Sequence, residues 1–138
     1  MLVHPARSIV SVLGLAVLLF AGCGDDGGNS GDDGSGGEPE PVGDTVADAP
    51  TVEVVAFDFG YSPDPLVVPA GEPVNVVMRV TSGAHNLRIE GTDLQLPIVE
   101  SGDAVVSALT VAEPGEYRMV CTVPGHEAEG MVSTLQVG

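Results

Sequence analysis

The sequence of 138 residues contains no lysine and no tryptophan, and only 4% of its residues are aromatic. The chain has twenty acidic residues and four arginines, so its formal net charge is −16 at pH 7. Because such a chain has almost nothing with which to neutralise phosphates, the composition argues against nucleic-acid binding. The charge favours either a basic protein partner or simple solvation of an acidic surface, and composition alone leaves both open.

No apolar stripe with the 3.6-residue period of a helix occurs after the N-terminal region. Short β-branched runs alternate instead with turns rich in glycine and proline, which is typical of strands. About seven to eight such strands predict an all-β fold, an antiparallel Greek-key β-sandwich. Residues 91–102 are expected to form an irregular loop. The predicted strands cover residues 52–57, 66–68, 74–80, 87–90, 104–111, 116–121 and 132–137.

The first 23 residues have the order of a secretory signal. Arg7 precedes an apolar run of about 13 residues, and the run ends in Gly22-Cys23. A helix needs about 20 residues to span a bilayer, so a signal helix is favoured over a permanent membrane span. Residues 19–23 resemble the lipobox of bacterial lipoproteins, which implies cleavage before Cys23 and attachment of a lipid to its sulfur. The alternative is an ordinary secretory signal that ends near an unrelated cysteine.

Residues 24–50 consist mainly of glycine and acidic residues, with almost no large apolar side chains. Such a segment cannot bury enough apolar surface to fold, so a disordered acidic linker is predicted. A flexible chain of this length has an end-to-end distance of roughly 30 Å. We therefore expect a tether between an anchor at the membrane and one folded domain at residues 51–138.

The predicted domain has one cysteine, Cys121, and two histidines, His85 and His126. Cys121, His126 and Met131 are each five positions apart, between the end of one predicted strand and the start of the next. A proline and two glycines in this segment allow a short loop to fold back, so that its side chains can converge. His85 follows the predicted strand 74–80, at a second turn.

Two imidazoles, one thiolate and a weak thioether suit a copper ion that alternates between Cu(I) and Cu(II). Zinc would accept the same histidines and cysteine but gains little from a methionine. We therefore predict that His85, Cys121, His126 and Met131 bind one copper ion. A free thiolate at Cys121 requires that it not pair with Cys23, which the predicted lipidation also prevents.

Four further residues with possible metal-binding groups are assigned other roles. Glu127 and Glu129 lie in the same loop and are expected to face solvent. Met78 and Met119 lie within predicted strands and are expected in the core, since side chains two apart on a strand share a face.

Residues 51–138 resemble a cupredoxin, a blue copper protein of the plastocyanin and azurin kind. The motif Cys121-x4-His126-x4-Met131 carries the resemblance, together with His85-Asn86 upstream. Its loop spacing is more similar to the rusticyanin, auracyanin and sulfocyanin kinds than to plastocyanin. The resemblance implies that the two histidines and the cysteine are equatorial ligands and that the methionine is axial. It also implies that Asn86 and Thr122 hydrogen-bond between the two ligand segments.

These inferences predict a monomeric one-electron carrier, tethered on the outer side of the cytoplasmic membrane. Its expected partners are redox proteins, a cytochrome or an oxidase. A copper-delivery protein with the same fold and no redox turnover is the alternative, and a metal-free interaction module is a third possibility. An enzyme of the multicopper type would need further histidines, so we expect no enzymatic activity.

Overall fold

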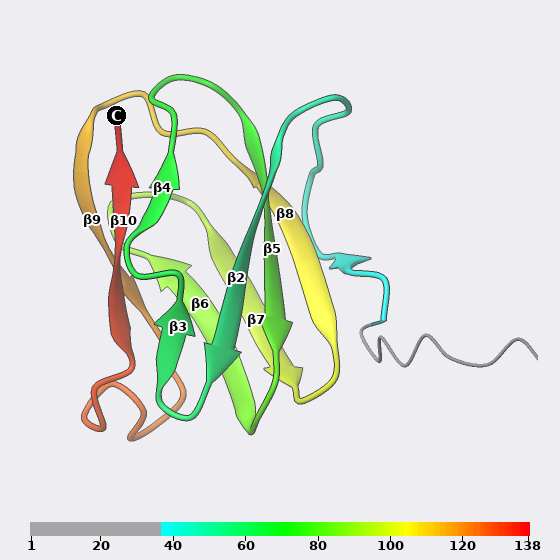
Figure 1. Cartoon of the computed structure of the whole chain (residues 1–138), viewed down its shortest axis with the longest axis vertical. Helices are drawn as coiled ribbons and strands as arrows, with labels where there is room; N and C mark the ends of the chain where they lie inside the picture. The colour runs from blue at the N-terminus through cyan, green and yellow to red at the C-terminus, as the bar shows by residue number, and fades with distance from the viewer. Residues whose placement is uncertain (1–36) are drawn as a thin grey trace, which may run out of the picture. The chain divides into compact units, whose positions relative to one another are not determined.

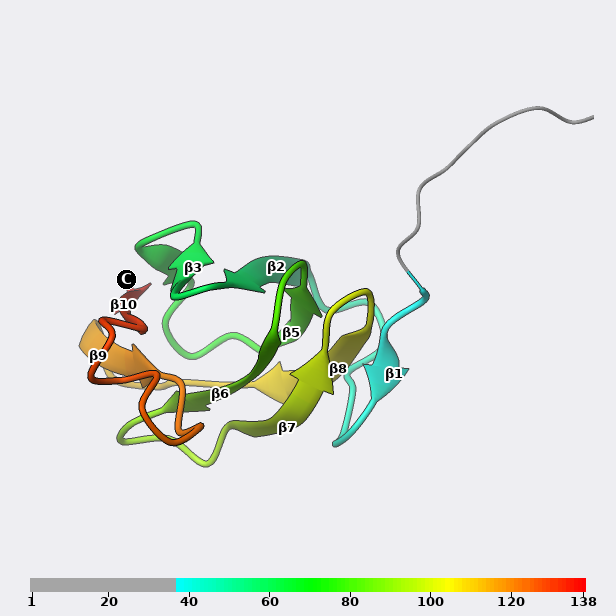
Figure 2. The ribbon, with the colours of Figure 1, turned by 90° about the horizontal axis from the view of Figure 1, so that it is seen from below.

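The computed structural model describes residues 37–138, which form two five-stranded sheets packed face to face (Figure 1, Figure 2). The predicted all-β sandwich is therefore confirmed. Within this described part there is no helix, and hence none long and apolar enough to cross a membrane. The predicted signal segment and Cys23 lie outside the described residues, as does linker segment 24–36.

Ten strands make up the two sheets, two or three more than predicted. The first sheet has the order β1-β8-β5-β2-β3, and the second has the order β4-β10-β9-β6-β7. The strands of the first sheet are β1 (Glu40–Pro41), β8 (Ala104–Leu109), β5 (Val74–Val80), β2 (Thr51–Phe57) and β3 (Gly60–Ser62). Those of the second sheet are β4 (Leu66–Val68), β10 (Val132–Val137), β9 (Gly115–Val120), β6 (Ala84–Ile89) and β7 (Gln95–Glu100).

The core lies between the sheets and follows the two-residue period of the strands. In β5, Val76 and Met78 are fully buried on one face, whereas Asn75 and Arg79, which flank them on the other face, are half-buried. This alternation turns the apolar side chains inward, and removing them from water stabilises the sandwich by about 25 cal/mol per Å² of apolar surface. The largest fully buried side chains are Met78, Leu87, Ile89, Leu96, Met119, Met131 and Leu135.

The predicted antiparallel pairing holds for five strand pairs, but three others are parallel: β2 with β5, β4 with β10, and β1 with β8. After β3 the chain crosses to the second sheet as β4 and then returns to the first sheet as β5 (Figure 1). This crossover brings β5 back beside β2 in the same direction.

The loop predicted over residues 91–102 is also wrong, since it contains β7. Leu96 and Val99 of this strand are buried and pair with Leu87 and His85 of β6. Pro97 obscured the strand in the sequence, but β7 is an edge strand, where a missing backbone donor is tolerated. As a result His85 lies within β6 and not at a turn, beside a register shift between His85 and Leu87.

Residues 37–50, expected to belong to the disordered linker, are bound to the edge of the first sheet. The amide of Val42 donates to the carbonyl of Val106, and the amide of Ala108 donates to the carbonyl of Asp44. The side chain of Asn75 accepts from the amide of Val46 and donates to its carbonyl, at 3.0 and 2.9 Å. Composition did not predict this, because backbone groups and one asparagine hold the segment.

Replacing Asn75 with alanine removes both hydrogen bonds to Val46. We expect the amide of Val46 to exchange with solvent deuterium faster, while the free energy of unfolding falls by about 1 kcal/mol or less. The global effect is small because Val46 is exposed and water replaces the lost partner. Gln136→Ala, an exposed change on β10, is the control. Unchanged protection of Val46 would contradict the role given to Asn75.

Candidate metal centre

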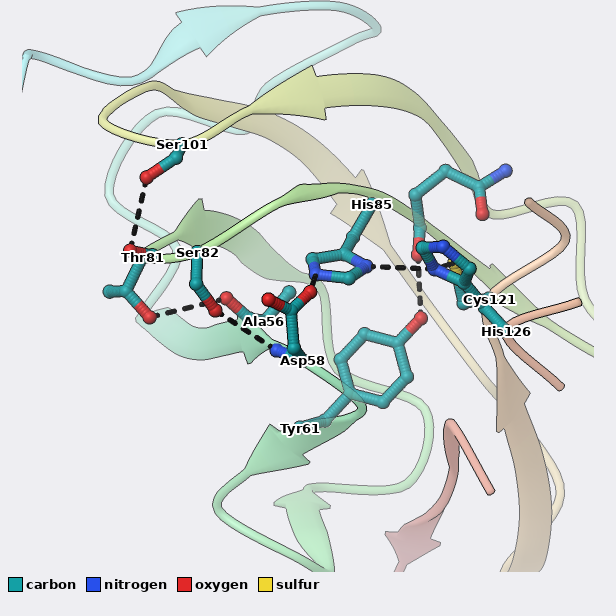
Figure 3. Close-up of polar contacts among 10 residues, drawn as sticks. Ala56, Asp58, Tyr61, Thr81, Ser82, His85, Ser101, Cys121 and His126 are labelled. Carbon is teal, nitrogen blue, oxygen red and sulfur yellow. Dashed lines mark hydrogen bonds and ion pairs between the residues drawn. The ribbon is translucent and has the colours of Figure 1, made fainter. Parts of the chain in front are cut away.

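Three side chains with metal-binding atoms meet at one end of the sandwich. The ligand atoms of His85, Cys121 and His126 all lie within 4.8 Å of one another. The Nδ1 atoms of the two histidines are 3.1 Å apart, and the Sγ of Cys121 is 3.6 Å from Nδ1 of His126. His85 and Cys121 are fully buried, and His126 is partly exposed. Figure 3 shows both rings turned toward this point.

The three side chains come from two separate segments. His85 lies near the start of β6, Cys121 directly follows β9, and His126 lies in the loop between β9 and β10. Strands β6 and β9 are hydrogen-bonded neighbours, which fixes the distance between His85 and Cys121. The sheet therefore positions two of the three groups before the loop contributes the third.

The loop from Cys121 to Met131 is closed by its own backbone. The amide of Met131 donates to the carbonyl of His126 at 3.0 Å, and the amide of Cys121 donates to the carbonyl of Met131 at 3.2 Å. Gly125 and Gly130 adopt φ values of 89° and 97°, which residues with a Cβ rarely adopt. Met131 is fully buried where the loop joins β10.

Asn86 and Thr122, each directly after a metal-binding side chain, hydrogen-bond to each other. The Nδ2 of Asn86 donates to Oγ1 of Thr122, and the amide of Thr122 donates to Oδ1 of Asn86, both at 2.7 Å. The amide plane of Asn86 thus joins two segments 36 positions apart in the sequence. This pair holds the segment that carries His85 at a fixed position relative to the segment that carries Cys121.

Sequence reasoning missed Tyr61, a buried residue of β3. Its hydroxyl donates to the backbone carbonyl of Asn86 at 2.5 Å (Figure 3). Burial, followed by the nearby Cys121 thiol, raises the pKa of Tyr61 far above its ordinary value. The hydroxyl therefore stays protonated and continues to donate. Nothing in the sequence links Tyr61 to Asn86, because the contact depends on how the two sheets pack.

The turn between β2 and β3 also supplies two residues that the sequence did not indicate. Oδ1 of Asp58 lies 3.1 Å from Nε2 of His85, although their alignment falls short of a hydrogen bond. The Phe59 ring stands edge-on to the His126 ring, with centroids 5.2 Å apart and planes at 84°. Neighbouring residues of one turn thus contact each histidine.

The charged residues of the loop do not join the cluster. Glu127 is exposed and pairs with Arg118, which also contacts Glu90. Glu127 raises the pKa of Arg118, chiefly through their hydrogen bond. Glu129 is exposed as well. Met119 and Met78 are buried in the core, and within residues 37–138 the sulfur of Cys121 forms no disulfide.

The donor set fits one copper ion. Two nitrogens bound to one ion at about 2.0 Å with tetrahedral angles lie roughly 3.3 Å apart, close to the observed separation of the two Nδ1 atoms. Two imidazoles and a thiol without a carboxylate suit copper better than magnesium or calcium, which prefer oxygen. The residues present are therefore suited to binding one copper ion.

The fold and this cluster together define a cupredoxin-like domain. A family model described as a cupredoxin-like domain matches residues 35–133, and the chain belongs to this family. The match begins before Thr51, in agreement with the binding of residues 37–50 to the sheet edge.

Individual similar proteins extend the comparison. Cytochrome c oxidase subunit 2 of Thermus thermophilus is 38% identical over 73 residues, which are 51% of this chain and 52% of that protein. The chain thus spans about half the length of this relative. Among solved structures, auracyanin from Roseiflexus castenholzii is 20% identical, covers 65% of this chain and 98% of its own, and has a TM-score of 0.58.

The periplasmic domain of cytochrome oxidase subunit II from Bradyrhizobium japonicum is 13% identical to this chain. It covers 68% of this chain and 86% of its own, with a TM-score of 0.58. At these identities, the likeness to both solved structures concerns the fold alone.

Replacing Tyr61 with phenylalanine should lower the free energy of unfolding by roughly 1–3 kcal/mol, because the carbonyl of Asn86 loses its buried donor. The pKa of Tyr61 is higher in the native state, so its contribution is full below about pH 10 and declines as the pH rises further. Urea unfolding near neutral pH and above about pH 10 measures both effects.

The matched control is Tyr117→Phe, which removes an exposed hydroxyl bound to the carbonyl of Glu113. It should cost less, since water can replace the donor. Equal losses in the two variants would contradict the buried role of Tyr61.

Proposed function

We propose that this protein is a type 1 (blue) copper protein that carries one electron at a time between redox partners. His85, Cys121 and His126 are the equatorial ligands, and Met131 is the axial ligand. The observation that carries the proposal is the convergence of two imidazole nitrogens and one thiol within 4.8 Å, largely buried from solvent. Copper bound there would supply one-electron chemistry by alternating between Cu(I) and Cu(II).

The assignment of Met131 follows from its position. It is buried, it follows the loop that carries Cys121 and His126, and its backbone is bonded to both. Met119 is equally buried, but it lies within β9 and outside this loop. The choice of Met131 therefore rests on its place at the end of the ligand loop and on the family motif.

The surrounding residues keep the ligands in one arrangement. The Asn86–Thr122 pair joins the two ligand segments, and the Tyr61 hydroxyl holds the backbone carbonyl of Asn86. A site held in this way changes little when its charge changes, so little of the barrier to electron transfer comes from moving ligands. This is the protein's contribution to the chemistry of a redox cofactor.

Electrons are expected to enter and leave through His126, the partly exposed ligand. Val123, Pro124 and Gly125 precede it, and Gly83 and Ala84 come from the neighbouring segment; none of these five is charged. Phe59, 43% exposed, adds an aromatic ring beside His126. Small uncharged faces of this kind suit the brief contacts of redox proteins. A cytochrome or an oxidase is the proposed partner, consistent with the oxidase-subunit relative.

The chain is proposed to act outside the cytoplasm. A lipid on Cys23 would anchor it to the membrane, and the acidic residues that follow would serve as a tether. The signal-like first 23 residues support this, and one structural neighbour is a periplasmic domain. Residues 37–50 are bound to the domain, so they would not be part of the tether. We propose no enzymatic activity for the chain itself.

Copper delivery without redox turnover is the alternative function. It would favour an open ligand set that releases the ion readily, whereas His85 and Cys121 are fully buried. Burial therefore favours the electron carrier. Rapid exchange of electrons with a cytochrome supports the carrier, and transfer of copper to a recipient protein without electron exchange supports delivery.

Adding Cu(II) to the purified protein should produce an intense visible band from charge transfer between the Cys121 thiolate and copper. One equivalent should saturate the band. Cys121→Ser should abolish it while leaving the fold intact, because serine is nearly isosteric. A colourless wild-type protein would contradict the proposed function.

Replacing Pro124 with glutamate should slow electron exchange with a partner protein while leaving the visible copper band unchanged. The new charge lies in the uncharged face beside His126 but outside the ligand set. Ala128→Glu, an exposed change in the same loop, controls for added charge. Equal exchange rates in Pro124→Glu and wild type would place docking elsewhere.

A further inference from the structure

The turn between β2 and β3 places a carboxylate against the buried side of one proposed ligand. Oδ1 of Asp58 is 3.1 Å from Nε2 of His85, whose side chain is fully buried, while the Asp58 side chain remains 47% exposed. Figure 3 shows Asp58 on the side of the His85 ring opposite His126. The two nitrogens of His85 therefore face different groups: Nδ1 the cluster, and Nε2 the carboxylate.

No group of the described residues forms a hydrogen bond with this nitrogen. Among residues 37–138, Nε2 of His85 is the one buried side-chain nitrogen or oxygen without a hydrogen-bond partner. Asp58 is close enough to accept a hydrogen bond from Nε2 after a small rotation of either side chain. Buried polar groups in native proteins are almost always paired. The unpaired Nε2 therefore indicates that the Asp58 carboxylate is its hydrogen-bond partner when the site is in use.

The space for Asp58 is built by the segment between β5 and β6. The amide of Asp58 donates to Oγ of Ser82 at 3.0 Å, which holds the turn in place. Gly83 has a φ of 69°, and a Cβ there would lie 2.5 Å from Oδ1 of Asp58 and 3.1 Å from Nε2 of His85. Any larger residue at position 83 would displace the carboxylate.

The same segment is tied to both of its neighbours, so the space is rigid. Oγ of Ser101 donates to the carbonyl of Thr81 at 3.0 Å, and Oγ1 of Thr81 donates to the carbonyl of Ala56 at 3.4 Å (Figure 3). The segment that faces Asp58 is thus held by β2 and by the turn after β7.

We propose that Asp58 is a positioning residue for the copper site, which keeps the His85 proton on Nε2 and adds a negative charge behind the ligand. This rests on the proposed function, because it assumes that Nδ1 of His85 binds the metal. A proton on Nε2 leaves the Nδ1 lone pair free to face the cluster, as in carboxylate–histidine–metal arrangements. The added charge stabilises Cu(II) over Cu(I) and so lowers the reduction potential.

The proposed proton on Nε2 also decides the direction of the contact between the two histidines. Two Nδ1 atoms 3.1 Å apart can hydrogen-bond only if one carries the proton and the other accepts it. With His85 protonated on Nε2 beside Asp58, its Nδ1 is the acceptor and His126 supplies the proton. Asp58 thereby sets the direction of this bond in the metal-free protein.

The first test uses the metal-free protein and needs no copper chemistry. Nitrogen NMR of the imidazoles at mildly alkaline pH should show His85 protonated on Nε2 in the wild type. Asp58→Asn should keep this tautomer, since its amide oxygen can still accept, whereas Asp58→Ala should lose it. A mixed or Nδ1-protonated His85 in the wild type would overturn the positioning role.

The second test measures copper binding and reduction potential in the loaded protein. Asp58→Ala should lower Cu(II) affinity by about 10–100-fold, the usual loss when a group that supports a ligand is removed. Cu(I) affinity should fall less, and each tenfold difference between the two losses raises the potential by about 59 mV. Asp58→Asn should also raise the potential, because it removes the charge.

Asp93→Asn is the matched control for charge, because Asp93 is exposed beyond the opposite end of β6. If Asp58→Asn and Asp93→Asn shift the potential equally, Asp58 acts only through net charge and the proposal fails. If the wild type forms no visible copper band, the proposed function fails, while the NMR result still decides the role of Asp58.

Gly83→Ala tests the same contact without changing a charge. Its Cβ should displace the carboxylate and reproduce the tautomer change and the raised potential of Asp58→Ala. Gly102→Ala is the matched control, since Gly102 has a φ of 99° but a Cβ added there would meet no atom within 4 Å. Both changes strain the backbone similarly, so equal tautomers and potentials in the two variants would overturn the proposal.

Discussion

Two hydrogen bonds between Asn86 and Thr122 join the segments that carry the metal-binding side chains, and the site depends on that connection. His85 belongs to β6, whereas Cys121 and His126 belong to the end of β9 and its loop. The backbone pairing of β6 with β9 ends at Arg88 and Val120, so the Asn86–Thr122 pair continues the connection up to the metal-binding residues. The reciprocal pair at 2.7 Å, with Tyr61 bound to the carbonyl of Asn86, makes them one unit.

The electrostatics of the site differ from those of the molecule as a whole. The chain carries a formal charge of −16, yet the three residues that precede His126 in its loop, Val123, Pro124 and Gly125, are uncharged. Glu127 is turned toward Arg118, away from the cluster. Asp58 alone brings a carboxylate to a histidine of the cluster within the described residues. The local charge can thus adjust the metal's potential independently of the acidic surface.

The sequence alone predicted the site residues that lie close together in one loop or belong to residue types that are rare in the domain. The domain has one cysteine and only two histidines, so spacing and chemistry predicted the three side chains that the structure brings together. Met131 was predicted from its position in the same loop. Asp58, Phe59 and Tyr61 could not be predicted, because they reach the cluster through strand order and the packing of two sheets.

The errors in the predicted fold have similar physical causes. Because Pro97 is unusual within a strand, the sequence did not indicate the edge strand β7. The crossover through β4 places β2 and β5 in parallel, which local sequence patterns do not encode. Residues 37–50 look like a linker by composition, but backbone hydrogen bonds bind them to β8.

A crystal structure of the copper-loaded protein tests the central claim most directly, namely that the fold presents a preformed copper site. We expect one ion bound by Nδ1 of His85, Nδ1 of His126 and Sγ of Cys121, with these side chains keeping the rotamers they have without the metal. The Met131 sulfur should be the fourth, weaker ligand. An ion bound by the loop carboxylates, or a His85 ring turned so that Nε2 faces the metal, would contradict this claim.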